Sequence, residues 1–357
     1  MNPTTRRALR LGGRVALVAL VVLLLARFAR TVAWGETWTA LRRASVPLLL
    51  LATTLNVLSL LARGVRWALF LRGAGVRDVG LAVRGAVVGS GLNNVLPASG
   101  GEAARVLLVA RRSRAPTARV AATVALDRVV DLLIFLALLA LAPHVVPLPG
   151  MLQRWGRIAG VVLGCALAFV LPLLVRAARQ RRRGLEPPVA AVEGAPWTQR
   201  TRAHLAQFAD ALTTIVAGRR LAPALAISLV SWTLQLLTYH VTARAAGLPA
   251  SMVASAAAML AVNMTFFVQV TPGNVGVFQV IYALVMAAFG LPRGPAIAVA
   301  LLVQALQIVP VTIAALVLAP PWKLRRRRTD MPAAPGTVSA AVPARPAVER
   351  RRRLDEE

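Results

Sequence analysis

Residues 93–105 read NNVLPASGGEAAR and lie between apolar runs. The stretch combines a proline, a glycine pair and two charged residues: Pro97, Gly100, Gly101, Glu102 and Arg105. A helix that crosses lipid does not readily hold these residues so close together, because hydrocarbon offers no partner to charges or to freed backbone groups. We therefore predict irregular backbone here that faces protein or a water-filled cavity, and a candidate functional site.

The composition of the chain indicates an integral membrane protein. Of the 357 residues, 57% are hydrophobic, and the mean hydropathy is +0.66, above the range of soluble domains. The formal net charge is +29, but the arginines cluster between apolar runs and in the tail, where they mark cytoplasmic faces and contact anionic lipid. A basic folded face with interleaved aromatic residues is missing, so no nucleic-acid partner is expected.

Cysteine and histidine usage gives no support for a metal or a cofactor. The chain has one cysteine, Cys165, which excludes an intrachain disulfide and a cysteine-based metal cluster. Its three histidines are scattered without ligand spacing. We predict no metal and no cofactor.

Apolar runs of roughly 20 residues predict an all-α, polytopic helical bundle with six to eight membrane spans. Arginines precede the first run and no small-residue cleavage site follows it, so the N-terminus is expected in the cytoplasm. The segments that we interpret as spans are 15–26, 46–62, 120–142, 156–175, 221–243 and 295–318.

These spans divide the chain into two membrane halves joined by a basic linker. Both termini are expected on the inner side of the cytoplasmic membrane, and the Ala-, Pro- and Arg-rich tail is expected to be disordered. The expected parts are a cytoplasmic N-terminus 1–14, a first half 15–175, a linker 176–220, a second half 221–320 and a tail 321–357.

The positive-inside rule predicts a re-entrant hairpin over residues 79–110. The basic stretches on both sides of it, 63–78 and 111–119, are both expected inside, so the segment between them enters and leaves by one face. Pro97 marks the break between the two arms, and the glycines let the arms pack closely. In the stretch 63–78, Trp67 and Phe70 are expected to anchor at the cytoplasmic interface.

A second break lies within residues 251–290 and leaves two topologies open. It is either the tip of a second hairpin or part of three crossings, and the position of the C-terminus allows both. A hairpin here enters from the opposite face and makes each half a span, a hairpin and a span, which is an inverted repeat of the kind that builds transporter sites. In that case Pro97, Gly100 and Gly101 correspond to Pro272, Gly273 and Gly276.

Four motifs resemble one known family. They are RGVRWALFL at 63–71, NNVLPASGGEAARVLL at 93–108, ALDRVVDLL at 125–133 and TPGNVGVFQ at 271–279. In order and spacing they are similar to the lysylphosphatidylglycerol synthase transmembrane-region family, also called the flippase-like domain family, over residues 46–318. The resemblance implies a stand-alone translocation module, because no aminoacyl-transferase or glycosyltransferase domain accompanies it. The last motif usually ends in Glu, where this chain has Gln279.

Charged residues within apolar runs are the first candidates for lipid contact. Glu102 and Arg105 are spaced i, i+3 and are expected to pair, with Arg105 presented to a lipid phosphate. Asp127 and Asp131, with Arg128 beside them, are expected either to neutralise Arg105 or Arg84 as scaffolding or to relay protons.

A second group of candidates has two readings. Arg63 and Arg66 either collect anionic headgroups or only mark the cytoplasmic face. Asn93, Asn274 and Gln279 either bond headgroup hydroxyls or satisfy the backbone of broken helices. Further polar residues in the second half are read as interhelical hydrogen-bonding residues and not as ligands: Gln235, Tyr239, His240, Gln304 and Gln307.

Two functions follow from these patterns. The first is translocation of an anionic phospholipid or a polyprenyl-phosphate-linked lipid, down a gradient or coupled to an ion, because the chain has no nucleotide-binding loop. The second is a non-transporting membrane partner that recruits a separate glycosyltransferase or lipid-modifying enzyme through residues 176–220 and the tail. Enzymatic activity is not expected, since Asp127 and Asp131 lack a histidine or metal set and Ser99 lacks a base.

Overall fold

The computed structural model describes residues 30, 32–95, 100–145, 150–182, 221–265 and 274–319. The predicted first span at 15–26, the breaks at Pro97, Pro272 and Gly273, most of the linker and the tail lie outside these residues. Every regular element in the described part of the chain is a helix, as predicted for an all-α bundle.

Three of the described helices are long and apolar enough to cross a membrane: Val46–Ala74, Ala222–Ala245 and Arg293–Leu318. The helices are α2 (Trp34–Arg42), α3 (Val46–Leu71), η1 (Arg72–Ala74), α4 (Val79–Val95), α5 (Gly100–Ser113), α6 (Thr117–Val145), α7 (Gly150–Arg182), α9 (Leu221–Ala245), α10 (Met252–Thr265), α11 (Val277–Ala288) and α12 (Arg293–Leu318). The predicted spans at 120–142 and 156–175 lie within α6 and α7. The helical membrane bundle expected from the sequence is confirmed.

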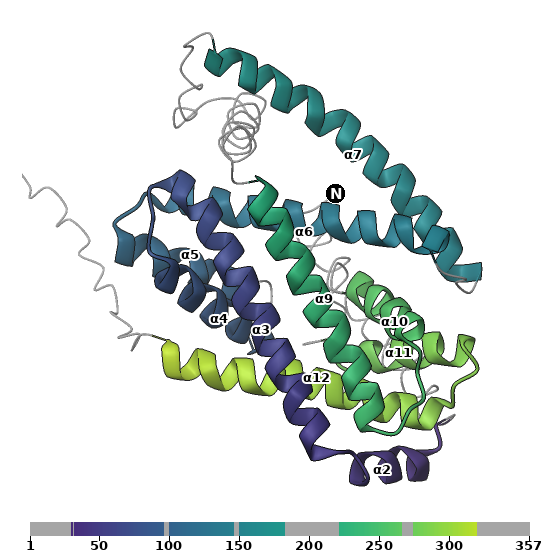
Figure 1. Ribbon diagram of the computed structural model, residues 1–357. Helices are drawn as coiled ribbons and strands as arrows, with labels where there is room; N and C mark the ends of the chain where they lie inside the picture. The colour runs from purple at the N-terminus through teal and green to yellow at the C-terminus, as the bar shows by residue number, and fades with distance from the viewer. Residues whose placement is uncertain are drawn as a thin grey trace, which may run out of the picture. The chain divides into compact units, whose positions relative to one another are not determined.

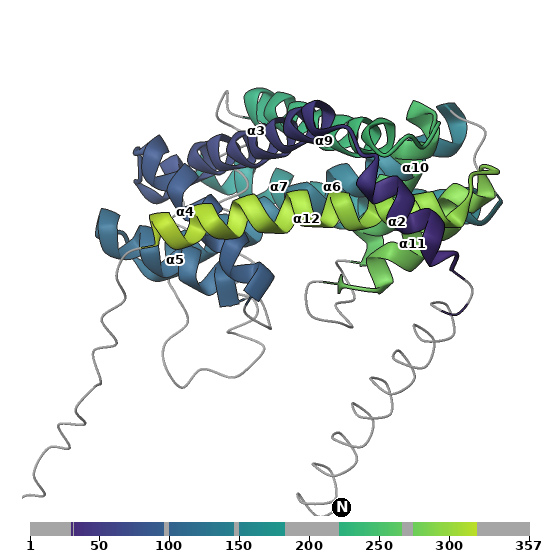
Figure 2. The same cartoon turned by 90° about the horizontal axis from the view of Figure 1, so that it is seen from below.

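Helices α3 and α9 pack side by side along one side of the bundle and run antiparallel (Figures 1 and 2). The backbone N–H of Ser45, just before α3, donates to the carbonyl of Ala245, at the end of α9, at 2.8 Å. Further along, the hydroxyl of Ser59 donates to the carbonyl of Ser231 at 2.9 Å. From the first contact to the second, residue numbers rise in α3 and fall in α9, so the two helices run antiparallel.

Helices α4 and α5 form a tightly packed pair at the place predicted for the first hairpin. The backbone N–H of Gly101 donates to Oδ1 of Asn93 at 2.9 Å, which ties the start of α5 to the end of α4. A Cβ atom on Gly101 would overlap the carbonyl oxygen of Gly89, so the two helices touch through glycine backbone. The predicted role of the glycines in close packing of the arms is confirmed.

Helices α10 and α11 form the corresponding pair in the second half. Helix α11 has 12 residues, and the residues at both of its ends are described. At about 1.5 Å per residue it is too short for the roughly 30 Å of hydrocarbon. Its length favours a hairpin over additional full crossings.

The two helix pairs begin at opposite ends of the bundle. Helix α4 follows the end of α3, and α10 follows the end of α9, which is antiparallel to α3. Helix α12 connects the two ends: Thr37 of α2 donates to the carbonyl of Gly294 at 3.0 Å, and Arg84 of α4 donates through Nε to the carbonyl of Leu318 at 2.8 Å. The order long helix, short pair, long helix therefore occurs twice, in opposite directions.

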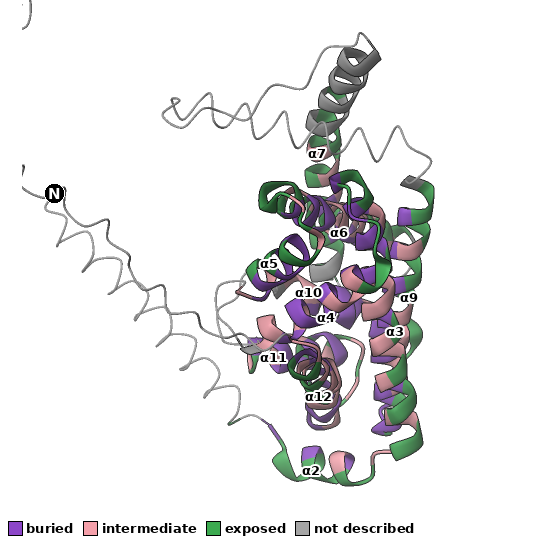
Figure 3. Cartoon of the chain, turned by 90° about the vertical axis from the view of Figure 1, so that its left-hand side faces the viewer, coloured by how far each residue is buried: buried purple, intermediate pink, exposed green. Residues whose placement is uncertain are grey.

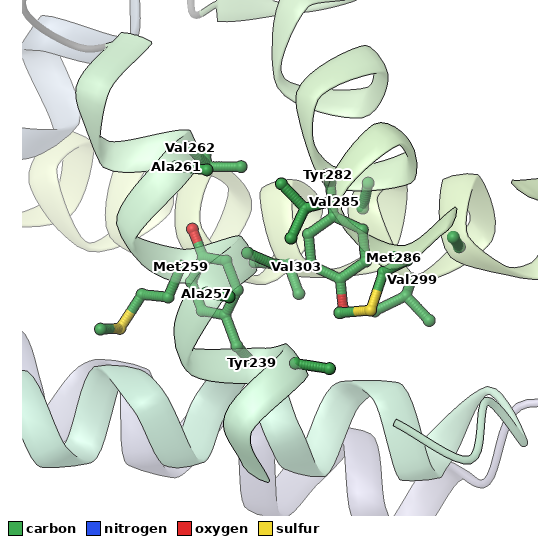
Figure 4. Close-up of a cluster of buried hydrophobic side chains, with 14 of the residues drawn as sticks. Tyr239, Ala257, Met259, Ala261, Val262, Tyr282, Val285, Met286, Val299 and Val303 are labelled. Carbon is green, nitrogen blue, oxygen red and sulfur yellow. The ribbon is translucent and has the colours of Figure 1, made fainter. Parts of the chain in front are cut away.

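The buried apolar side chains form two cores, one for each half. The first gathers residues mainly of α3 to α6, and the second gathers residues mainly of α9 to α12 with Phe135 and Leu139 of α6. Part of the second core is drawn in Figure 4. In Figure 3 α10 is mainly buried and α4 is mainly buried or half-buried, whereas the described part of α7 is mainly exposed.

The stretch that was expected at the membrane interface is instead part of the first core. Trp67 and Phe70 have 0% and 1% of their surface exposed, so the expectation that they anchor at an interface is wrong. Helix α3 continues through Leu71 and does not end near Ala62, because Arg66 and Trp67 find buried polar partners within the protein.

Candidate functional site

Arg66 of α3 is the centre of a buried network of charged side chains. Its Nε and Nη2 donate to Oδ1 of Asp127 at 3.1 and 2.8 Å, and its Nη1 donates to Oδ1 of Asp131 at 2.5 Å. Nη1 also donates to the hydroxyl of Ser228 of α9 at 3.0 Å. The side chain of Arg66 is 0% exposed. Since these donors are occupied, a structural role replaces the expected contact of Arg66 with a headgroup.

Arg105 of α5 joins the same network through the other oxygen of Asp127. Its Nη2 donates to Oδ2 of Asp127 at 3.0 Å, and its guanidinium lies over the indole of Trp67, 3.7 Å from the ring centroid. Trp67 is held in place by a hydrogen bond of 3.1 Å from Nε1 to the hydroxyl of Thr123. Ion pairing and cation–π stacking therefore fix the plane of the Arg105 guanidinium.

Glu102 forms its ion pair with Arg128 of α6 and not with Arg105. The expected pairing of Glu102 with Arg105 inside one helix is therefore wrong, because α6 supplies a carboxylate to Arg105 and a guanidinium to Glu102. The alternative that Asp127 neutralises Arg105 is confirmed. Arg84, the other arginine considered for Asp127 and Asp131, bonds the carbonyl of Leu318 instead.

Arg63 lies one turn before Arg66 and reaches α9. Its Nη2 donates to Oε1 of Gln235 at 2.5 Å. The Nε atoms of Arg63 and Arg105 are both buried, and neither has a hydrogen-bond partner among the residues that the structure describes. An unpaired donor on a buried guanidinium is costly, so these two arginines retain capacity for an anion.

The charges of this region do not balance. Arg63, Arg66, Arg105 and Arg128 carry four positive charges, while Glu102, Asp127 and Asp131 carry three negative charges. One positive charge is left over in a place where α3, α5, α6 and α9 meet. Excess charge inside a helical membrane protein is expensive and commonly marks a substrate or ion site.

The polar candidates near the two breaks bond local groups. Asn93 accepts from Gly101, as described above, and Gln279 accepts from the N–H of Gly276 at 2.7 Å while its Nε2 donates to Oε1 of Gln304 at 2.6 Å. Asn274 is buried with a φ of 54°, and Gly276 has a φ of 86°. For Asn93 and Gln279, the expectation that amides satisfy the ends of broken helices is confirmed.

The structure brings together the charged candidate residues of the first half. The uncharged candidates of the second half lie apart from that network. Arg63, Arg66, Arg105, Asp127 and Asp131 lie in or beside one network, with Glu102 and Arg128 at its edge, whereas Asn274, Gly276 and Gln279 belong to the start of α11. Sequence reasoning missed Trp67 and Ser228 as partners of these arginines. A tryptophan directly after Arg66 in a long apolar run was the available signal for Trp67.

Comparison with known proteins identifies a family of membrane proteins. A family model described as the lysylphosphatidylglycerol synthase TM region matches residues 14–315. The chain is 26% identical over 275 residues to a UPF0104 membrane protein of Methanothermobacter thermautotrophicus, covering 73% of this chain and 81% of that protein. It is 26% identical over 278 residues to a UPF0104 membrane protein of Pyrococcus horikoshii, covering 73% of this chain and 82% of that protein.

A longer relative is the glycosyltransferase AglD of Haloferax volcanii, with 26% identity over 322 residues, which are 82% of this chain and 51% of AglD. No solved structure matches the chain. The family model covers most of the sequence, including every helix of the network described above. The chain is therefore a membrane protein that belongs to the lysylphosphatidylglycerol synthase transmembrane-region family.

Proposed function

We propose that this protein translocates a lipid with an anionic headgroup, either a phospholipid or a polyprenyl-phosphate-linked lipid, across the cytoplasmic membrane. The observation that carries the proposal is the buried positive charge with unsatisfied donors on Arg63 and Arg105. A phosphate group supplies both the negative charge and the several acceptor oxygens that such donors need. No catalytic step is part of the proposal.

Arg66 and the two aspartates serve as the frame of this proposed site. Arg66 bonds Asp127 and Asp131 of α6 and Ser228 of α9, so it holds three long helices together. Arg105 has one ion pair and one stacked ring, and it lies on the short helix α5. In the proposed cycle Arg105 and Arg63 contact the phosphate while Arg66 keeps the frame in place.

The paired short helices fit the transport of a lipid headgroup. Helices that end within the membrane expose polar backbone and side chains only where protein or water covers them. Each half of this chain has one such pair, and the pairs begin at opposite ends of the bundle. A headgroup passing between them would stay among polar groups while the acyl chains stay in lipid.

The proposal is tested by replacing the two arginines with glutamine and measuring flipping in proteoliposomes. Arg105→Gln leaves Asp127 paired with Arg66, so the frame is retained. Exchange of a fluorescent anionic phospholipid, followed with an impermeant quencher, is expected to fall roughly tenfold or more in Arg105→Gln and Arg63→Gln, because a hydrogen bond to a charged group contributes about 1.5–3 kcal/mol.

Arg111→Gln serves as the matched control, because Arg111 is exposed near the end of α5, outside the network. It is expected to flip lipid at the wild-type rate. Wild-type rates in folded Arg105→Gln and Arg63→Gln would rule out their proposed role in binding phosphate.

The second candidate function is a non-transporting partner of a separate glycosyltransferase or lipid-modifying enzyme. It is favoured by the relative named glycosyltransferase AglD, of which this chain spans 51%. Deletion of residues 325–357 separates the two functions. A translocator is expected to keep its flipping rate without the tail, whereas an adaptor would lose capture of its enzyme.

A further inference from the structure

The two tyrosines of the chain lie against each other in the second core. The chain has only Tyr239 of α9 and Tyr282 of α11, and their ring centroids are 6.2 Å apart. Both are 0% exposed, and neither hydroxyl has a hydrogen bond of good geometry among the described residues, although the side-chain amide of Gln307 in α12 lies near the hydroxyl of Tyr239. In Figure 4 the two rings lie beside each other with their hydroxyls pointing in opposite directions, among alanine, valine and methionine side chains.

Hydroxyl groups at these positions are not explained by packing. Phenylalanine would fill nearly the same space and bury the same ring, without the cost of a polar atom that has no partner. The ring of Phe278 packs against that of Tyr239, with 6.2 Å between the ring centroids, so the core accepts phenylalanine next to this site. Buried hydroxyls on two neighbouring rings, neither with a hydrogen bond of good geometry, therefore point to a partner that is bound in another state of the protein.

The position of Tyr282 corresponds to that of Arg105 in the repeated architecture. Arg105 is the sixth residue of α5 (Gly100–Ser113), and Tyr282 is the sixth residue of α11 (Val277–Ala288). Each lies against an aromatic ring of the preceding long helix, Trp67 in α3 and Tyr239 in α9.

A second pair of contacts supports this correspondence. The third residues of α5 and α11 are Glu102 and Gln279, and they bond Arg128 and Gln304, the twelfth residues of α6 and α12. The bond is ionic in the first half and joins two amides in the second half. The same contact is thus made twice with different chemistry.

A line of polar groups connects the tyrosines with the arginine site. Gln235 accepts the hydrogen bond from Arg63 at 2.5 Å. Tyr239 lies four residues after Gln235 on α9, so both side chains share one face of that helix. Arg63, Gln235, Tyr239 and Tyr282 therefore lead from the cationic first half to the uncharged second half.

We infer that Tyr239 and Tyr282, with Gln235 beside them, form a second subsite that binds the hydroxyl groups of a polyol or sugar attached to the lipid phosphate. This inference rests on the proposed function, because it extends the arginine site by an uncharged neighbour. A tyrosine hydroxyl donates and accepts, and its ring offers an apolar face, so both match a polyhydroxylated headgroup. Helix α11 is flanked by Gly276 and Gly290, with φ of 86° and 76°, and the inference requires that α11 move away from α9 to admit the headgroup.

The test compares binding of two anionic lipids to the full-length protein. Phosphatidylinositol carries a ring of hydroxyls on its phosphate, and phosphatidic acid carries the phosphate alone. In phosphatidylcholine vesicles the wild type is expected to prefer phosphatidylinositol. Tyr239→Phe and Tyr282→Phe are each expected to weaken phosphatidylinositol binding roughly three- to tenfold, as loss of one hydrogen bond predicts, and to leave phosphatidic acid binding unchanged.

Control variants separate this subsite from the arginine site. Phe278→Leu disturbs packing on the Tyr239 ring but removes no hydroxyl, and its preference between the two lipids is expected to match the wild type. Arg105→Gln is expected to weaken binding of both lipids equally. If it does not, that result counts against the phosphate site alone and not against the tyrosine subsite. No preference in the wild type, or a preference unchanged in both tyrosine variants, overturns the subsite.

A spectroscopic measurement reports on the hydroxyls without mutation. Because the chain has two tyrosines, the tyrosine ring bands in ultraviolet resonance Raman spectra arise from this site alone. Their intensity ratio is expected to shift toward hydrogen-bonded hydroxyls when phosphatidylinositol is added, and not when phosphatidic acid is added. The same shift with both lipids would contradict recognition of the polyol.

Discussion

Asp127 bonds two arginines from different helices, so the cost of removing either arginine depends on how Asp127 remains paired. Its Oδ1 accepts from Arg66 and its Oδ2 accepts from Arg105. Removal of one partner of a buried ion pair leaves an uncompensated charge, which costs more than the pair itself contributes. The two arginines differ in this respect. Asp127 loses one of two partners in either case, but within the described part of the chain Asp131 has its ion pair with Arg66 alone.

Arg66→Met is therefore expected to destabilise the protein more than Arg105→Met. Without Arg66, Asp131 loses its ion pair and Ser228 loses its bond to α3. The free energy of unfolding is expected to fall by about 3–5 kcal/mol. Arg105→Met leaves both carboxylates paired with Arg66. Thermal unfolding in detergent compares the two variants, and equal stability would contradict the structural role assigned to Arg66.

Gln279 holds the start of α11 through two bonds of its side-chain amide. Its Oε1 accepts from the N–H of Gly276, and its Nε2 donates to Gln304. Gln279→Leu loses both and is expected to lower stability by about 1–2 kcal/mol. Gln279→Glu keeps an acceptor at the helix N-terminus, where negative charge is favourable, and Gln304 can turn its amide to donate, so the expected change is small.

Melting temperatures of the two Gln279 variants check this reading. If Gln279→Leu is as stable as the wild type, the amide does not support α11.

From the sequence we predict which charged residues form the site, but one of the predicted ion pairs is wrong. Spacing i, i+3 brought Glu102 and Arg105 together on one helix face, as the pattern requires. The bundle instead packs α5 against α6, and Arg128 and Asp127 are better placed partners. Spacing within one helix carries no information on which other helix lies opposite, so this part of the site could not be predicted from one sequence.

The hairpin formed by α4 and α5 depends on glycine at the point where the helices touch. Gly101→Ala places a Cβ atom against the carbonyl of Gly89, and backbone cannot move aside as a flexible side chain can. The expected loss of stability is at least about 2 kcal/mol, and the flipping rate should fall with it because Arg105 lies on the displaced helix.

Gly164→Ala is the matched control for the hairpin glycine. Gly164 also lies within a helix, α7, and a Cβ atom there meets nothing within 4 Å. Alanine is expected to be neutral or stabilising by up to about 1 kcal/mol at this position. Equal behaviour of the two variants in thermal unfolding and flipping would show that close contact of α4 with α5 is not required.

The sequence predicts the first short helix pair, leaves the second open between a hairpin and additional crossings, and places the end of α3 too early. The predicted hairpin over 79–110 matches α4 and α5, because glycine, proline and flanking arginine mark its limits within the chain itself. Helix α3 was expected to end near Ala62, since Arg63 and Arg66 suggested an interface. Their partners Gln235, Asp127 and Asp131 come from α9 and α6, and only the tertiary fold shows that these charges are satisfied inside the protein.

The two halves of the protein repeat one arrangement in opposite directions. The antiparallel contact of α3 with α9 and the matched bonds of Glu102 and Gln279 support an inverted repeat, although one half is charged and the other is not. This difference is consistent with a site that binds a phosphate on one side and uncharged groups on the other. Inverted repeats of this kind allow one half to open while the other is closed.

The inverted arrangement predicts opposite accessibility of the loops that flank the two helix pairs. Arg114 lies in the exposed turn between α5 and α6, and Met252 is exposed at the start of α10. In a Cys165→Ser background, which removes the one native cysteine, Arg114→Cys is expected to react with an impermeant thiol reagent only from the cytoplasmic side. Met252→Cys is expected to react only from outside, because the positive-inside rule predicts that the arginine-rich loop at Arg114 lies inside and the inverted arrangement then puts the start of α10 on the other face. Labelling of both cysteines from one side would mean that the two helix pairs enter from the same face, and an alternating cycle between equivalent halves would then have no structural basis.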